Sequence, residues 1–421
     1  MSQLDTHSAA GGSHQPGDPT ADAAALDTDR SPLLERLGGR IRGGDLGALP
    51  VIVGVVAIWA VFTVLNGVFL SSRNLVNLAT DSASIGVIAL GIVFVLLVAQ
   101  IDLSVGSISG VAAAVLAVGM TQLGWPSWLS MGAAIVVGLA TGLIYGWIFV
   151  RFDVHTFVIT LAGLLTLLGF QLWVLSTHGS INIPFDTWIV RFMQQMYIPK
   201  IASYFIMALI AAAFLASRLA RRVRRLAHRL PTHALTADIT VALILLVALE
   251  VACWYLNRDR GISAPFAFFV VLVFIAHFAL TRTSWGRAVF AVGGSVEAAR
   301  RAGINVKRIF VSVIVICTVL AAVGGLLDAG RLAAATTSSG TADVNLDAIA
   351  AAVIGGTSLF GGRGSAYSAL LGIIVIQSIA SGLTLINLSA SVRFMITGGV
   401  LLIAVVVDAV TRKTRAVHGR A

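Results

Sequence analysis

The stretch IFVSVIVICTVLAAVGGLL, from Ile309 to Leu327, runs for nineteen residues without a charge. A helix needs about 20 apolar residues to cross the hydrocarbon core of a bilayer, so this stretch predicts a membrane span. The whole chain shares this character: of 421 residues, 57% are hydrophobic, 42 are glycine and 11% are charged, with a mean hydropathy of +0.93. So few charges could not cover the surface of a soluble domain, and the composition therefore predicts a membrane protein.

Similar apolar runs recur on both sides of this stretch and predict an all-α, polytopic transmembrane fold with about 10 to 12 spans. The runs are Ala48–Leu70, Ser84–Ala99, Val105–Thr121, Leu129–Val150, Thr156–Leu175, Ser203–Ser217, Asp238–Leu256, Phe266–Thr281, Ile309–Leu327, Leu346–Phe360, Ala366–Ile386 and Arg393–Thr411. Two interruptions, Gln100–Ser104 and Gly361–Ser365, are interpreted as tight turns or as the tips of re-entrant segments.

The lysines and arginines between the runs predict the orientation, because cytoplasmic loops carry an excess of them. With both termini in the cytoplasm, 22 of the 29 basic residues fall on the inside. Residues 1–47, rich in Ala, Asp, Gly, Ser and Thr, are predicted to be a disordered cytoplasmic tail. Residues 48–411 then form one membrane domain with a basic loop at 282–308, and residues 412–421 form a second cytoplasmic tail.

Several function classes are excluded by what the sequence lacks. There is no phosphate-binding P-loop, no HExxH or CxxC metal motif and no GxSxG nucleophile motif. We therefore expect no catalytic activity, no cofactor and no bound metal. Cys253 and Cys317 lie inside apolar runs and are interpreted as small buried hydrophobic residues. The basic residues are spread between spans rather than gathered in one patch, which argues against nucleic acid as a partner and favours membrane lipid.

The segment IDLSVGS, Ile101–Ser107, places a carboxylate between two apolar runs. Polar groups at membrane depth are costly, so Asp102 is interpreted as capping the helix that begins at Val105, as lining or gating a transport path, or as carrying a proton. Leu103–Ala113 and Phe360–Gly372 share a short sequence similarity, a glycine-serine step that opens an apolar helix after an interruption. Interrupted apolar segments in corresponding positions of two halves of a chain indicate a translocation path. The candidate path residues are Asp102, Ser104, Ser107, Gly356, Thr357 and Ser358.

Three glycines, Gly138, Gly142 and Gly146, follow one another at four-residue spacing. In a membrane helix this spacing allows a neighbouring helix to approach closely. The neighbour is predicted to be a helix of the same chain or a second subunit.

The basic loop at 282–308 contains a potential short helix from Ser295 to Ala302, with Ser295 as its N-cap and Gly303 as its left-handed end. A helix of two turns is too short to be stable by itself in water. We therefore expect it to dock into another structure.

The segment EAARRAG, Glu297–Gly303, resembles the coupling-loop signature of ABC-importer permeases. The surrounding Ala291–Val306, together with IDLSVGS and Asp347–Ser365, is similar to the ribose/xylose branch of bacterial sugar permeases. In that family the short cytoplasmic helix docks into a cleft on a separate ATPase subunit. The residues that the resemblance assigns to this coupling are Gly294, Glu297, Ala298, Ala299, Arg300, Gly303 and Ile304.

The resemblance implies a multi-pass permease of the cell (inner) membrane, which forms a homodimer with ATPase subunits and an extracytoplasmic sugar-binding protein. Within the branch, the extra span Asp238–Leu256 and the segment Asn257–Phe266 are similar to permeases for xylose. Two alternatives stay open. One is an ABC permease for ribose, another sugar, a nucleoside or a branched-chain amino acid, and the other is a secondary transporter that needs no ATPase.

Overall fold

The computed structural model describes residues 49–176, 179–230, 234–389, 391–392, 395–400, 402 and 406, which belong to one compact unit. The predicted tails, 1–47 and 412–421, and most of the predicted last span, Arg393–Thr411, lie outside the described residues. Helices dominate the described part, which confirms the predicted all-α membrane fold.

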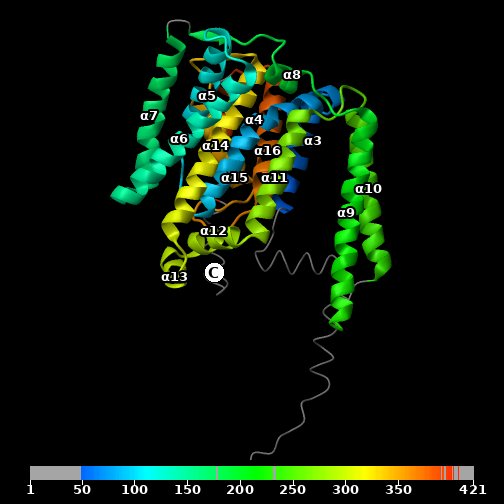
Figure 1. Ribbon diagram of the computed structural model, residues 1–421. Coiled ribbons are helices and arrows are strands. Elements are labelled where there is room, and N and C mark those ends of the chain that lie inside the picture. The colour runs from blue at the N-terminus through cyan, green and yellow to red at the C-terminus, as the bar shows by residue number, and fades with distance from the viewer. Residues whose placement is uncertain are drawn as a thin grey trace, which may run out of the picture. The chain divides into compact units, whose positions relative to one another are not determined.

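The elements follow one another along the chain as shown in Figure 1. They are α3 (Leu49–Leu65), α4 (Ser72–Leu97), α5 (Val105–Thr121), α6 (Ser127–Phe152), α7 (Thr156–Leu175), β1 (Ser180–Asn182), α8 (Trp188–Gln194), α9 (Lys200–Ala227), α10 (Leu235–Leu256), α11 (Ala264–Arg282), α12 (Ser284–Gly294), α13 (Val296–Arg301), α14 (Val306–Leu332), β2 (Ala334–Thr336), α15 (Ala342–Ile354) and α16 (Ala366–Leu385). The two short strands pair in an antiparallel ribbon.

Within the described residues, eight helices are long and apolar enough to cross a membrane: α4, α6, α7, α9, α10, α11, α14 and α16. Two more apolar helices, α5 and the Val51–Leu65 part of α3, are shorter. The predicted bounds Val105–Thr121 and Thr156–Leu175 coincide with α5 and α7.

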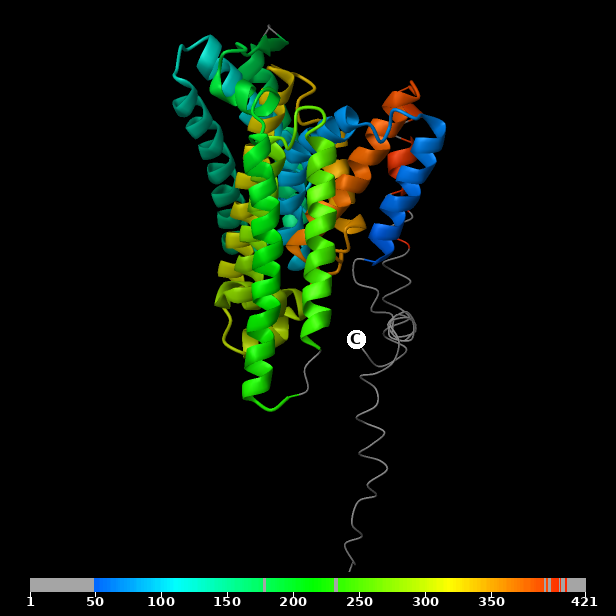
Figure 2. The same ribbon diagram turned by 90° about the vertical axis from the view of Figure 1, so that its right-hand side faces the viewer.

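The central helix of the bundle is α14, which packs against α4, α5 and α6. Ser84 and Ile88 of α4 lie beside Gly324 of α14, whereas Gly91 lies beside Cys317. Because these pairs run in opposite order along the two helices, α4 is antiparallel to α14. In Figure 2, α9 and α10 stand in front of this bundle, and both are mostly exposed, as helices that face lipid would be.

The structure differs from the sequence prediction at two helices. The predicted span Leu346–Phe360 is wrong, because the helix there, α15, has only 13 residues and a length of about 20 Å. Glycine at positions 355 and 356 ends it. Conversely, α9 extends beyond the predicted span Ser203–Ser217 as far as Ala227, since arginine and leucine both favour the helix.

Candidate functional site

The short helix α13 lies at one end of the bundle, directly after α12, which runs across that end (Figure 1). Ser295 separates the two helices, and its side-chain oxygen accepts a hydrogen bond from the backbone N–H of Ala298 at 3.2 Å. Gly303 follows the helix with a φ of +80°, the left-handed conformation that closes helices. The predicted short helix, its N-cap and its glycine end are therefore confirmed.

The other described residues cover little of the surface of α13. Ala299 is its one buried residue. Glu297 pairs with Arg300 at 3.7 Å and with Arg301 at 3.3 Å, and all three side chains are at least 60% exposed. Exposed ion pairs contribute at most about 1 kcal/mol each, so this six-residue helix has little stabilisation of its own. Its outer face is free to contact another protein.

The structure places the predicted coupling residues in one continuous segment at this end of the bundle. Gly294 and Ala298 are exposed, and Ile304 is half-buried against the core. The structure therefore describes all seven predicted coupling residues: Gly294, Glu297, Ala298, Ala299, Arg300, Gly303 and Ile304.

Two helices, α5 and α15, begin in the interior of the bundle. Ser109, in the second turn of α5, lies against Gly325 of the central helix. The backbone N–H of Gly106 in α5 donates a hydrogen bond to the side-chain oxygen of Asn345 in α15, at 2.6 Å. The N-terminal turns of the two helices are thus in contact. From there α5 runs toward the end of the bundle that carries α8, and α15 runs toward the end that carries α12 (Figure 1).

This contact depends on glycine. A Cβ placed on Gly106 would lie 2.7 Å from the carbonyl oxygen of Gly340, and one on Gly110 would overlap the side chain of Gln171. Gln171 also holds the loop before α15, because its amide nitrogen donates to the carbonyl oxygen of Ser339 at 2.8 Å. Interrupted helices whose N-termini meet inside the membrane are the arrangement in which many transporters place their substrate. The sequence similarity to Leu103–Ala113 pointed to Phe360–Gly372 and not to α15. The helix that begins within Phe360–Gly372 is α16, which is long enough to cross the membrane.

Asp102 lies just before α5 and is 1% exposed. One carboxylate oxygen accepts hydrogen bonds from both the backbone N–H and the hydroxyl of Ser104, at 2.8 and 2.7 Å. Its other oxygen is buried and has no hydrogen-bond partner among the described residues. Ser104 occupies the N-cap position of α5 without capping it through its side chain, and Ser107 is buried in the first turn.

The other predicted path residues lie elsewhere. Gly356, Thr357 and Ser358 follow the C-terminus of α15, so about 16 Å of helix separates them from the contact between Asn345 and α5. Thr357 is buried, and no described residue hydrogen-bonds its hydroxyl group. The candidate path residues therefore form two groups, one at the start of α5 and one after the C-terminus of α15.

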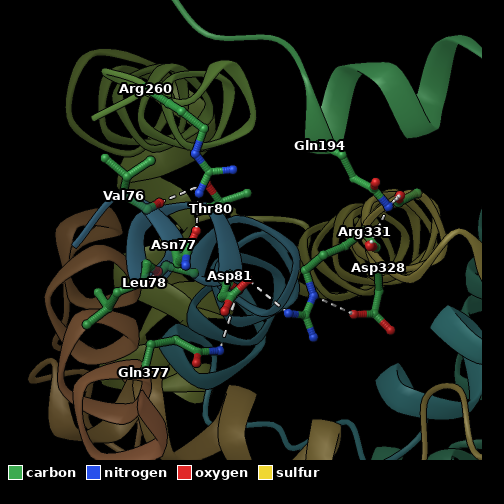
Figure 3. A network of polar contacts seen from close by, with 12 residues as sticks. Val76, Asn77, Leu78, Thr80, Asp81, Gln194, Arg260, Asp328, Arg331 and Gln377 are labelled. Carbon is green, nitrogen blue, oxygen red and sulfur yellow. Dashed lines mark hydrogen bonds and ion pairs between the residues drawn. The ribbon is translucent and has the colours of Figure 1, made fainter. Parts of the chain in front are cut away.

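A network of charged and amide side chains lies near the end of α14 that is farther from α13 (Figure 3). Arg331 of α14 donates a hydrogen bond to the carboxylate of Asp81 in α4 at 2.8 Å, and its Nε lies 3.7 Å from Asp328. Gln377 of α16 donates to the carbonyl oxygen of Asp81 at 3.4 Å, and Gln194 of α8 donates to that of Arg331 at 2.9 Å. The network joins four helices.

Sequence reasoning missed this network, because it ended one span at Leu327 and began another at Ser84. Asp328 and Arg331 are spaced three residues apart, which is a visible signal for a pair on one helix face. Their partner Asp81 is 250 positions away from Arg331, and no local pattern indicates that pairing.

The three spaced glycines of α6 pack within the chain, against α14. A Cβ on Gly138 would lie 2.6 Å from the carbonyl oxygen of Thr318, and one on Gly142 would overlap the hydroxyl of that residue. A Cβ on Gly146 would lie 2.8 Å from Val311. Of the two predicted neighbours, the structure shows a helix of the same chain. Within the described residues, no group of three His, Cys, Asp or Glu side chains could hold a metal ion.

Comparison with known proteins gives consistent matches over most of the chain. Residues 74–224 and 228–405 match the family described as the permease component of the branched-chain amino acid transport system. The xylose transport system permease protein XylH of Escherichia coli K12 is 36% identical over 370 residues, which cover 88% of this chain and 93% of the relative. XylH of Haemophilus influenzae is 33% identical, covering 89% and 99%.

A more distant relative is the ribose import permease protein RbsC of Escherichia coli K12, which is 27% identical over 85% of this chain and 92% of its own length. No solved structure matches the chain. The family match covers well over half of the sequence, and the eight long apolar helices are those of a protein that crosses the membrane repeatedly. The chain therefore belongs to the family of permease components of the branched-chain amino acid transport type, and it is a multi-pass membrane permease.

Proposed function

We propose that this chain is the inner-membrane permease subunit of an ATP-driven importer for a monosaccharide, with xylose as the first candidate. The observation that carries the proposal is α13, a short, capped helix that buries one side chain and leaves the others exposed. A separate ATPase subunit that binds this helix accounts for both its exposure and the absence of a P-loop in the sequence. Two relatives named as xylose permeases support the choice of sugar.

The end of the bundle that carries α13 is proposed to face the cytoplasm, together with both termini. Support comes from the distribution of charge, because 22 of the 29 Lys and Arg residues then lie inside. The arginine-rich half of α9 points toward the same end as α13 (Figure 1). These arginines would also contact anionic lipid at the cytoplasmic surface.

In this proposal the permease performs no chemistry on the sugar. Two copies of the chain assemble with two ATPase subunits and one extracytoplasmic sugar-binding protein, and the path opens alternately to the two sides. Movement of the ATPases shifts α13, and the helices that surround the path follow. The proposed path residues are Asp102, Ser104, Ser107, Gly356, Thr357 and Ser358, at the start of α5 and after the C-terminus of α15.

A different solute is the main alternative. The family description names branched-chain amino acid transport, and one relative is named as a ribose permease. The secondary-transporter alternative receives less support, since such a carrier has no use for an exposed coupling helix. Uptake of xylose, ribose, fructose and leucine by vesicles reconstituted with the permease, its ATPase subunit and its binding protein would decide between these solutes.

The ATPase assignment is tested with Gly303→Val. A β-branched residue at a φ of +80° costs roughly 1 kcal/mol or more, so α13 should lose its closed end. We expect the ATPase subunit to co-purify poorly and uptake to fall, while the permease accumulates normally. Gly124→Val is the matched control, because Gly124 has a φ of +65° and equally open surroundings but lies in the loop before α6. Normal co-purification and uptake for Gly303→Val would refute the assignment.

A further inference from the structure

Three backbone segments approach one another closely at the α13 end of the bundle. They are the turn after α4, at Leu97 and Ala99, the end of α12, at Gly293, and the loop after α15, at Gly361 and Gly362. We call these five residues the glycine junction. The backbone N–H of Gly362 donates a hydrogen bond to the carbonyl oxygen of Leu97 at 2.9 Å.

The packing at the glycine junction leaves no room for larger residues. A Cβ on Gly293 would overlap the carbonyl oxygen of Leu97 and lie 2.6 Å from the nitrogen of Gly362. A Cβ on Gly361 would lie 2.8 Å both from the Cβ of Ala99 and from the carbonyl oxygen of Gly293. Gly361 and Gly362 have φ values of +80° and +71°, which L side chains rarely adopt. Both the close approach and the backbone conformation therefore require glycine.

Each segment of the glycine junction continues into a part of the proposed transport machinery. Gly293 is followed after one further glycine by Ser295, the N-cap of α13. The turn at Leu97 and Ala99 leads through Asp102 into α5. The loop with Gly361 and Gly362 follows α15. Only Gly294 and Ser295 therefore separate α13 from the glycine junction. The other two segments of the junction are the one that leads into α5 and the one that follows α15.

We propose that the glycine junction transmits the movement of α13 to α5 and α15, so that Gly293, Gly361 and Gly362 are positioning residues for transport. Close-packed backbone has little compliance, and a displacement of α12 therefore moves the other two segments with it. As a result, α5 and α15 are displaced at the ends that lie nearest α13. This inference rests on the proposed function, because it takes α13 as the site where an ATPase acts.

A pair of glycine-to-alanine variants tests the glycine junction. Gly293→Ala places a methyl group against Leu97 and Gly362, whereas a Cβ on Gly132, in α6, meets nothing within 4 Å. For Gly293→Ala we expect the ATPase subunit to co-purify as with wild type, while ATP hydrolysis stimulated by the loaded binding protein falls at least tenfold. Gly132→Ala should stay within twofold of wild type. Equal stimulation of the two variants would refute the inference.

A second pair of variants decides the question even if Gly293→Ala fails to accumulate. One variant carries a Gly-Ser-Gly insertion between Gly294 and Ser295, and the other carries it between Gly124 and Trp125, in the loop before α6. The residues on both sides of each insertion are exposed. The first insertion loosens the link from α13 to the glycine junction, and the second leaves this link intact.

We expect the first insertion to lower stimulated ATP hydrolysis and sugar uptake at least tenfold and the second to retain at least half of each. Equal losses with the two insertions, or wild-type stimulation with the first, would overturn the inference. Failure of the proposed function itself gives a different result. In that case the wild-type permease neither co-purifies with the ATPase subunit nor stimulates its activity.

Discussion

Replacing Gly142 with alanine tests whether α6 approaches α14 as closely as the structure shows. The added Cβ would overlap the hydroxyl of Thr318 and lie 2.8 Å from the Cα of Val315, where an ordinary carbon–carbon contact is about 3.5–4.0 Å. The two helices must therefore separate locally by several tenths of an ångström or more. Overpacking of this kind costs about 1–3 kcal/mol.

Gly132→Ala is the matched control, because Gly132 lies on the same helix and a Cβ there meets nothing within 4 Å. Both substitutions share the gain of about 0.5–1 kcal/mol that alanine has over glycine in a helix. The difference between the two variants is therefore the overpacking cost itself. Each kcal/mol of destabilisation lowers the unfolding midpoint by roughly 2–4 °C or somewhat less in a protein of this size. We therefore expect the apparent midpoint of Gly142→Ala to lie several degrees below that of Gly132→Ala.

The chain carries its own reporters for this measurement. Cys253 and Cys317 are 1% and 0% exposed, so a thiol-reactive fluorogenic dye labels them only when the protein unfolds. Heating the purified permease in detergent with this dye gives the apparent midpoint of each variant. Identical midpoints for Gly142→Ala and Gly132→Ala would mean that α6 and α14 do not pack as described here.

Two further predictions concern Asp102 and the orientation. Asp102→Ala removes the acceptor of two buried hydrogen bonds and should lower the unfolding midpoint, at a cost of about 1–3 kcal/mol, whereas Asp102→Asn keeps an oxygen for Ser104 and should cost less. The same dye assay measures both, and equal stability of the two variants would count against this role. Single cysteines at Arg221 and Arg300 should resist impermeant thiol reagents in intact cells, while one at Gly124 should react. Rapid labelling of Arg221→Cys or Arg300→Cys would reverse the proposed orientation.

The sequence by itself determines the class of fold and much of the coupling segment. Membrane spans depend on local hydrophobicity, and helix ends depend on local capping chemistry, so both leave signals within about 20 residues. The bounds of α5 and α7 and the roles of Ser295 and Gly303 follow from such signals. Similarity of the motif at Glu297–Gly303 also indicates the permease family that the comparisons show.

Only the tertiary structure decides which segments meet. The contact of Gly106 with Asn345 joins residues 239 positions apart, and the pairing of Arg331 with Asp81 joins residues 250 apart. Glycine spacing predicts that some helix approaches closely at Gly142 but not which one, because a helix surface without side chains can accommodate many different neighbours. The glycine junction is likewise invisible in the sequence. Its close approach is a property of three backbones brought together by the packing of α12 against α4 and α14 and of α15 against α4 and α16, and no single segment encodes it.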